Sequence, residues 1–171
     1  FSESKAAVAG GVTSFMEMPN TIPNAITIDL LEEKYLLAAE KSLANFSFYL
    51  GASNDNLDEL KKLNPINNCG IKVFMGSSTG NMLVNDPNIL QQIFSTNNLI
   101  AVHCEDDRII KENLEKQKEI YGENIPFSAH SIIRNAEACY RSSSMAVAMA
   151  LKMNTRLHLL HLSSAEEMNL L

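Results

Sequence analysis

GIKVFM (residues 70–75) and LIAVHC (residues 99–104) are short apolar runs, each interrupted by a single polar residue. Runs of this length and composition predict strands that are buried on both faces, as in a parallel sheet. Residues 30–41, by contrast, place aliphatic side chains at i, i+3, i+4 and i+7 with charges between them, which predicts an amphipathic helix. Buried strands therefore alternate with amphipathic helices, which indicates an α/β fold.

The same alternation extends over the whole chain. Further helices are predicted over residues 2–9, after the N-cap and N1 pair Asp86-Pro87, over residues 106–118, and after the capping box at residues 164–167. Another predicted helix carries a narrow stripe of mostly small residues: Ala136, Tyr140, Ser144, Val147 and Leu151. The predicted strands are Val12–Met18, Phe46–Gly51, Gly70–Met75, Leu99–Cys104 and Arg156–Leu162.

Two architectures fit this pattern, an open doubly wound sheet and a (β/α)8 barrel. No strand is followed by a glycine-rich phosphate loop, which disfavours the nucleotide-binding open sheets, and Gly10-Gly11 is better explained as a helix C-cap. A complete barrel takes roughly 250 residues. We therefore predict that the 171 residues form about five strand–helix units, an internal excerpt of a (β/α)8 barrel. Residues 1–171 would be the central part of one domain.

Composition excludes several classes of protein. The net charge is −6, with no stripe of Lys or Arg that could bind nucleic acid. Apolar runs such as Ala6–Val12 are far shorter than the ~18 residues that a membrane span needs. The three cysteines are widely spaced and form no CxxC pair, so we expect reduced thiols in a cytoplasmic protein.

Polar residues stand at or near the carboxyl ends of the predicted strands, where the active site of a barrel lies. Lys72, in a buried strand, must lose its charge, reach solvent, pair with a glutamate or be chemically altered. A neutral amine could capture carbon dioxide as a carbamate and present two oxygens to metal ions.

His103 ends one of these strands, and two more histidines lie in the last strand. His158 and His161 are three residues apart, so strand alternation directs them to opposite faces. His161 is nearer the carboxyl end and is the candidate metal ligand, whereas His158 would be structural. Together with Lys72, the two candidate histidines favour zinc or a similar divalent ion.

At these residues the sequence resembles the dihydroorotases of the amidohydrolase superfamily. The similar stretches are VTSFMEMPNT (12–21), GIKVFMGSSTG (70–80), IAVHCED (100–106), RNAEACYRSSSMAVAMA (134–150) and HLLHLSSAEE (158–167). The lysine strand is shared with hydantoinases and dihydropyrimidinases, whereas MPNT and HLSSAE are more specific to dihydroorotases.

The resemblance implies a (β/α)8 barrel that holds two zinc ions. Lys72 matches the carboxylated lysine that bridges the metals, and His103 and His161 match the ligands of the second metal. Asn20 matches the asparagine that binds the substrate carboxylate. The family's HxH pair would lie upstream of Phe1 and its catalytic aspartate downstream of Leu171, so we expect the excerpt alone to be inactive.

The implied reaction is the reversible hydrolysis of dihydroorotate to carbamoyl aspartate in pyrimidine biosynthesis, and a homodimer is compatible with the family. Two alternatives remain open. One is a related cyclic amidase such as a hydantoinase, dihydropyrimidinase or allantoinase. Asn20 argues against it, because an amide aimed at a carboxylate suits an anionic ring. The other is a non-catalytic paralogue that keeps the barrel for assembly.

Overall fold

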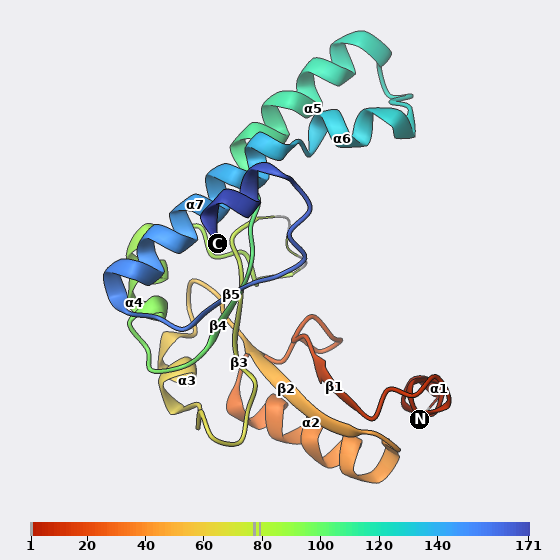
Figure 1. The fold of residues 1–171 in the computed structure, drawn as a ribbon, viewed down its shortest axis with the longest axis vertical. Helices are drawn as coiled ribbons and strands as arrows, with labels where there is room; N and C mark the ends of the chain where they lie inside the picture. The colour runs from red at the N-terminus through yellow and green to blue at the C-terminus, as the bar shows by residue number, and fades with distance from the viewer. Residues whose placement is uncertain (1, 77, 79) are drawn as a thin grey trace.

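Five parallel strands lie side by side in the order in which the chain presents them, β1-β2-β3-β4-β5 (Figure 1). The structure is a computed structural model that describes residues 2–76, 78 and 80–171. Ser77 and Thr79, within the GIKVFMGSSTG stretch, lie outside the described residues, as does Phe1. The strands are β1 (Ser14–Glu17), β2 (Asn45–Gly51), β3 (Gly70–Phe74), β4 (Ile100–His103) and β5 (Leu157–Leu159).

The strand order distinguishes between the two predicted architectures. A doubly wound sheet reverses its strand order at a switch point, whereas here every crossover adds the next strand on the same side. Such a sheet curls in one direction and is half of a barrel wall. The predicted α/β barrel class is therefore confirmed, although β5 is shorter than the predicted run over residues 156–162.

Helices follow the strands with the local signals that the sequence predicts. Asp86 accepts a hydrogen bond from the Asn88 N–H at 2.8 Å, as the predicted N-cap should. Gly11 has a φ of 86° after the first helix, the left-handed conformation of a C-cap. The helices are α1 (Ser2–Ala9), α2 (Ile28–Lys41), α3 (Leu57–Lys62), α4 (Pro87–Phe94), α5 (Asp107–Tyr121), α6 (His130–Ile133) and α7 (Ala136–Met153), with the 3-10 helices η1 (Phe127–Ala129) and η2 (Glu166–Leu170).

The hydrophobic core lies between the helices and one face of the sheet. Ile71 and Val73 of β3 are fully buried there, together with side chains from α2, α3, α4 and α7. Because successive side chains of a strand point to opposite faces, Lys72 and Phe74 lie on the other face. That second face is the concave side of the curled sheet.

α7 packs through a different face from the small-residue stripe noted in the sequence. Its buried residues include Ala138, Ser142, Ala146 and Ala150, which recur every four residues. Two members of the predicted stripe point to solvent instead, with Tyr140 41% and Leu151 80% exposed. Small side chains let α7 approach the sheet closely, and this explains why the face with Ala138, Ser142, Ala146 and Ala150 is the buried one.

Helices α5 and α6 form an arm that leans away from the sheet (Figure 1). The Asn113 side chain ties the arm together by donating to the carbonyls of Ile132 and Ile133, each at 3.3 Å. At its base the Asp106 N–H donates to the Ala138 carbonyl at 3.0 Å. The arm therefore leaves the sheet after β4 and returns to it at the start of α7.

No helix of the described residues is long and apolar enough to cross a membrane. Cys69, Cys104 and Cys139 are free thiols; Cys104 is buried and the other two are half-buried.

Candidate functional site at the carboxyl edge of the sheet

The register of β3 and β4 places the predicted lysine and histidine on one face. Lys72 pairs with Ala101, and Phe74 pairs with His103. Paired residues of parallel strands share a face, so Lys72 lies one pleat deeper than His103 on the concave side. The two side chains come from neighbouring strands near the edge at which the active sites of barrels lie.

Lys72 is 2% exposed, so it does not reach solvent. Its Nζ donates to the carbonyl oxygen of Val73 at 3.0 Å and lies 3.6 Å from the centroid of the Phe74 ring. No carboxylate of the described residues forms an ion pair with it. Burial lowers the pKa of Lys72 to about 7. Of the four fates predicted for this lysine, solvent contact and pairing with a glutamate are thereby removed.

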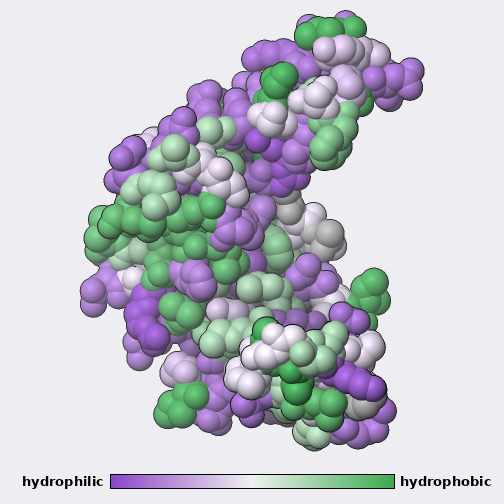
Figure 2. Space-filling model, turned by 45° about the vertical axis from the view of Figure 1, so that its right-hand side comes forward, coloured by the Kyte–Doolittle hydropathy of each residue, from purple (hydrophilic) through white to green (hydrophobic). Residues whose placement is uncertain are grey.

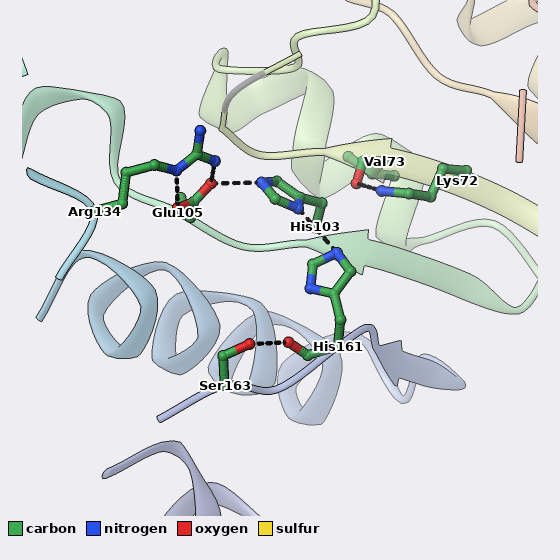
Figure 3. Close-up of polar contacts among 7 residues, drawn as sticks. All are labelled: Lys72, Val73, His103, Glu105, Arg134, His161 and Ser163. Atoms are coloured by element: carbon green, nitrogen blue, oxygen red, sulfur yellow. Dashed lines mark hydrogen bonds and ion pairs between the residues drawn. The ribbon is translucent and has the colours of Figure 1, made fainter. Parts of the chain in front are cut away.

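His103 and His161 meet directly (Figure 3). The Nδ1 atom of His103 lies 3.0 Å from the Nε2 atom of His161. His161 follows β5 in a left-handed conformation with a φ of 40°, and its carbonyl accepts from the Ser163 hydroxyl at 2.8 Å. This turn, not strand alternation, brings the His161 ring to His103.

The predicted contrast between His158 and His161 therefore has a different basis. His158 pairs with Ala101, which lies on the same face as His103. Its residue is exposed. Because β5 ends at Leu159, strand alternation does not extend to His161. The prediction that the two histidines point to opposite faces of one strand therefore does not apply.

Glu105 and Arg134, for which the sequence pattern predicts no role, complete the cluster. The Nε2 atom of His103 lies 2.7 Å from Glu105 Oε2, and the Arg134 Nε–H donates to Glu105 Oε1 at 2.8 Å. Arg134 Nη2 also contacts Oε2. Burial alone would raise the pKa of Glu105, but the hydrogen bonds from His103 and Arg134 outweigh it and hold that pKa at about 2. Both residues fall within the stretches that resemble dihydroorotases, IAVHCED and RNAEACY, and the sequence offers no other signal for them.

The donor set fits a zinc-type ion. Two imidazole nitrogens bound to one tetrahedral zinc at 2.0–2.1 Å lie about 3.3 Å apart, close to the 3.0 Å found between His103 and His161. Burial, the largest cause, lowers the pKa of His161 and favours the neutral ring that metals bind. Within the described residues no group of three His, Cys, Asp or Glu could hold a metal by itself, so a metal held here would need Lys72 or groups outside this set as further ligands.

Asn20 lies apart from this cluster along the chain. It follows β1 after the buried Pro19, and its residue is exposed. None of the contacts found among described residues joins it to Lys72, His103 or His161. Its predicted role in binding a substrate carboxylate stays a prediction.

The chain is similar over nearly its full length to three kinds of enzyme. It is 28% identical to an L-hydantoinase of Paenarthrobacter aurescens, to a dihydroorotase of Methanosarcina acetivorans and to an allantoinase of Streptomyces avermitilis. These alignments cover 99%, 100% and 100% of this chain but only 38%, 36% and 38% of the relatives. No protein-family model matches the chain.

Solved structures show the same fold. The L-hydantoinase (dihydropyrimidinase) of Arthrobacter aurescens superposes with a TM-score of 0.90 at 27% identity, over 98% of this chain and 38% of that one. A D-hydantoinase superposes with a TM-score of 0.82 at 20% identity, which supports the fold alone. The chain thus spans less than two fifths of the length of these proteins.

Proposed function

We propose that the chain is part of a metal-dependent cyclic amidase of the amidohydrolase superfamily, and that the substrate of the whole protein is dihydroorotate. The observation that carries this proposal is the convergence of the His103 and His161 imidazoles beside the buried Lys72. Residues 1–171 would form the central part of one barrel domain, in line with their 38% coverage of the L-hydantoinase chain.

Each residue of the site has a proposed role. Lys72, whose pKa is lowered to about 7 by burial, holds enough neutral amine near neutral pH to react with carbon dioxide. The amine nitrogen would attack the carbon of carbon dioxide and lose one proton, which leaves a carbamate as the bridging ligand. His103 and His161 would hold the second of two zinc ions. When bound, the metal pair supplies a water of lowered pKa and polarises the ring carbonyl.

The proposed choice of dihydroorotate rests on Asn20. Its side-chain N–H groups could donate to the carboxylate of dihydroorotate. Hydantoin and dihydrouracil have no carboxylate. The rival proposal is a hydantoinase-type amidase, favoured by the 0.90 TM-score with the L-hydantoinase. At 28% identity to each of the three kinds of relative, the sequence as a whole favours none of them.

The test is turnover by the full-length protein with zinc counted in the same sample. Opening of dihydroorotate, without opening of hydantoin or dihydrouracil, together with about two zinc ions per chain, is the expected result. Turnover of the uncharged rings with zinc bound would move the protein to the hydantoinase type. A sample that turns over no ring and binds no zinc would support the non-catalytic paralogue.

A further inference from the structure

We propose that Glu105 and Arg134 act as positioning residues that fix the tautomer of His103, so that its Nδ1 lone pair faces the point it shares with His161. The inference rests on the proposed function, because that point is the candidate zinc position. It concerns two residues that neither the sequence motifs nor the names of the relatives single out.

The cluster forms a single chain of contacts in the order Arg134, Glu105, His103, His161 (Figure 3). Glu105 is 6% exposed, and among the described residues its carboxylate contacts both Arg134 and His103. Both of its oxygens face Arg134, and Oε2 also faces His103. Both carboxylate oxygens of Glu105 are therefore engaged on the side of His103 away from His161. This position makes Glu105 a support for the ligand His103 and not a ligand itself.

The backbone around Glu105 is held in place on two sides. The neighbouring Asp106 N–H donates to Ala138 in α7 at 3.0 Å. On the other side, a Cβ atom at Gly76 would lie 2.2 Å from the Glu105 carbonyl oxygen, so only glycine permits this approach. The loop after β3 and the start of α7 thus fix the carboxylate relative to the His103 ring.

The hydrogen positions follow from this geometry. A carboxylate paired with arginine only accepts, so the hydrogen of neutral His103 sits on Nε2 and Nδ1 keeps its lone pair. Without metal, His161 Nε2–H then donates to His103 Nδ1 across the 3.0 Å contact. To present a second lone pair to zinc, only His161 has to move its hydrogen to Nδ1. His103 is already in the tautomer that binds, an arrangement typical of histidine ligands supported by a carboxylate.

Glu105→Gln in the full-length protein tests this directly. Arg134 can only donate, so it would hold the amide oxygen of the new side chain and leave the NH2 group facing His103. His103 would then have to accept at Nε2 and carry its hydrogen on Nδ1, where zinc should bind. We expect zinc affinity, measured by competition with a chelator, to fall about 10–100-fold.

A double variant should restore part of the zinc affinity that Glu105→Gln loses. In Glu105→Gln combined with Arg134→Met the amide is free to flip and offer its oxygen to His103. Zinc should therefore bind more tightly to the double variant than to Glu105→Gln alone. A purely structural role would make the double variant worse. Tighter binding of zinc by Glu105→Gln alone would overturn the inference.

Glu167→Gln is the matched control. Glu167 is also a buried carboxylate, 3% exposed, and it lines a cavity of about 230 Å³ together with Glu105 and His103. It accepts from Ser143 and Ser164 instead of a histidine. Its substitution should leave zinc affinity unchanged. An equal loss of affinity in Glu167→Gln and Glu105→Gln would show a general effect of buried charge and refute the tautomer role.

The ¹⁵N spectrum of histidine-labelled, zinc-free protein provides a reading that does not depend on a variant folding. It should show His103 protonated on Nε2; protonation on Nδ1 would overturn the inference. If the wild-type protein binds no zinc, the proposed function fails. If it binds zinc and Glu105→Gln binds it equally well, only the positioning role fails.

Discussion

Lys72 is a buried amine for which the described residues offer a carbonyl and an aromatic ring but no carboxylate. Burial lowers its pKa to about 7, whereas an unfolded lysine titrates near 10.4. Between these two values the unfolded chain carries a proton that the folded chain lacks, so stability rises with pH. An amine kept in this state is poorly suited to holding the fold together and well suited to reaction with an electrophile.

The free energy of unfolding of the zinc-free, full-length protein should therefore increase between about pH 7 and pH 10. The slope contributed by one such group is at most about 1.4 kcal/mol per pH unit. Lys72→Met should flatten this slope and stabilise the protein at pH 7, as measured by the urea midpoint at several pH values. Lys61→Met, at an exposed site, should keep the wild-type slope. Equal slopes in wild type and Lys72→Met would contradict the assignment.

Lys72→Ala should remove both zinc and turnover, because no other described side chain is placed to bridge two metals from β3. Metal analysis and a dihydroorotate assay on the same preparation check this. Lys61→Ala, which removes an exposed lysine paired with Asp58, should change neither. A metal-loaded, active Lys72→Ala variant would exclude the carbamate.

Asn20→Ala should raise the Michaelis constant for dihydroorotate about tenfold, the equivalent of 1.4 kcal/mol, and leave zinc content unchanged. Steady-state kinetics on dihydroorotate, with zinc counted in the same sample, separate binding from chemistry. The hypothesis fails if the Michaelis constant and turnover number both stay at their wild-type values.

Residue by residue, the site was only partly accessible from the sequence. Lys72 and His103 are polar residues within apolar strands, a signal that composition alone reveals. Glu105 and Arg134 lie 29 positions apart, and nothing local in the sequence distinguishes either from a solvent-exposed residue. His161 was selected by its distance along a strand, yet it is placed by a left-handed turn after that strand ends.

At the scale of single elements, short-range chemistry decides where helices begin. The side chains of Thr27, Asp86, Asp106 and Asn135 each accept a hydrogen bond from the first turn of the helix that follows. Such caps can be predicted because they involve residues two or three positions apart. The buried face of α7 could not be predicted in this way, because it depends on how closely the helix can approach the sheet.

Asp86→Ala should destabilise the full-length protein by about 1 kcal/mol, since it leaves the first N–H groups of α4 without the cap. Asp86→Asn keeps a capping oxygen and should remain near wild type. Urea unfolding of the three proteins measures the difference. Equal loss in both variants would assign the effect to charge and not to capping.

At the scale of the whole molecule, sequential strand order leaves β1 and β5 with a partner on one side only among the described residues. Open strand edges are sites of pairing between chains. We predict that residues 1–171, expressed alone, associate in light scattering and turn over no ring. A monodisperse, active fragment would contradict both the excerpt hypothesis and the proposed location of the remaining catalytic groups.

The arm of α5 and α6 has a consequence for how proteins of this kind can diverge. It departs and returns at nearly the same place, closed by the Asp106–Ala138 hydrogen bond and the Glu105–Arg134 ion pair. Beyond the first turn of α5, where Ile109 is buried and Asp106 pairs with Arg141 of α7, we expect the segment up to Arg134 to tolerate changes in length or sequence without altering the sheet. The rim of the site can thus differ between related proteins, provided that Glu105 and Arg134 at the base of the arm are kept.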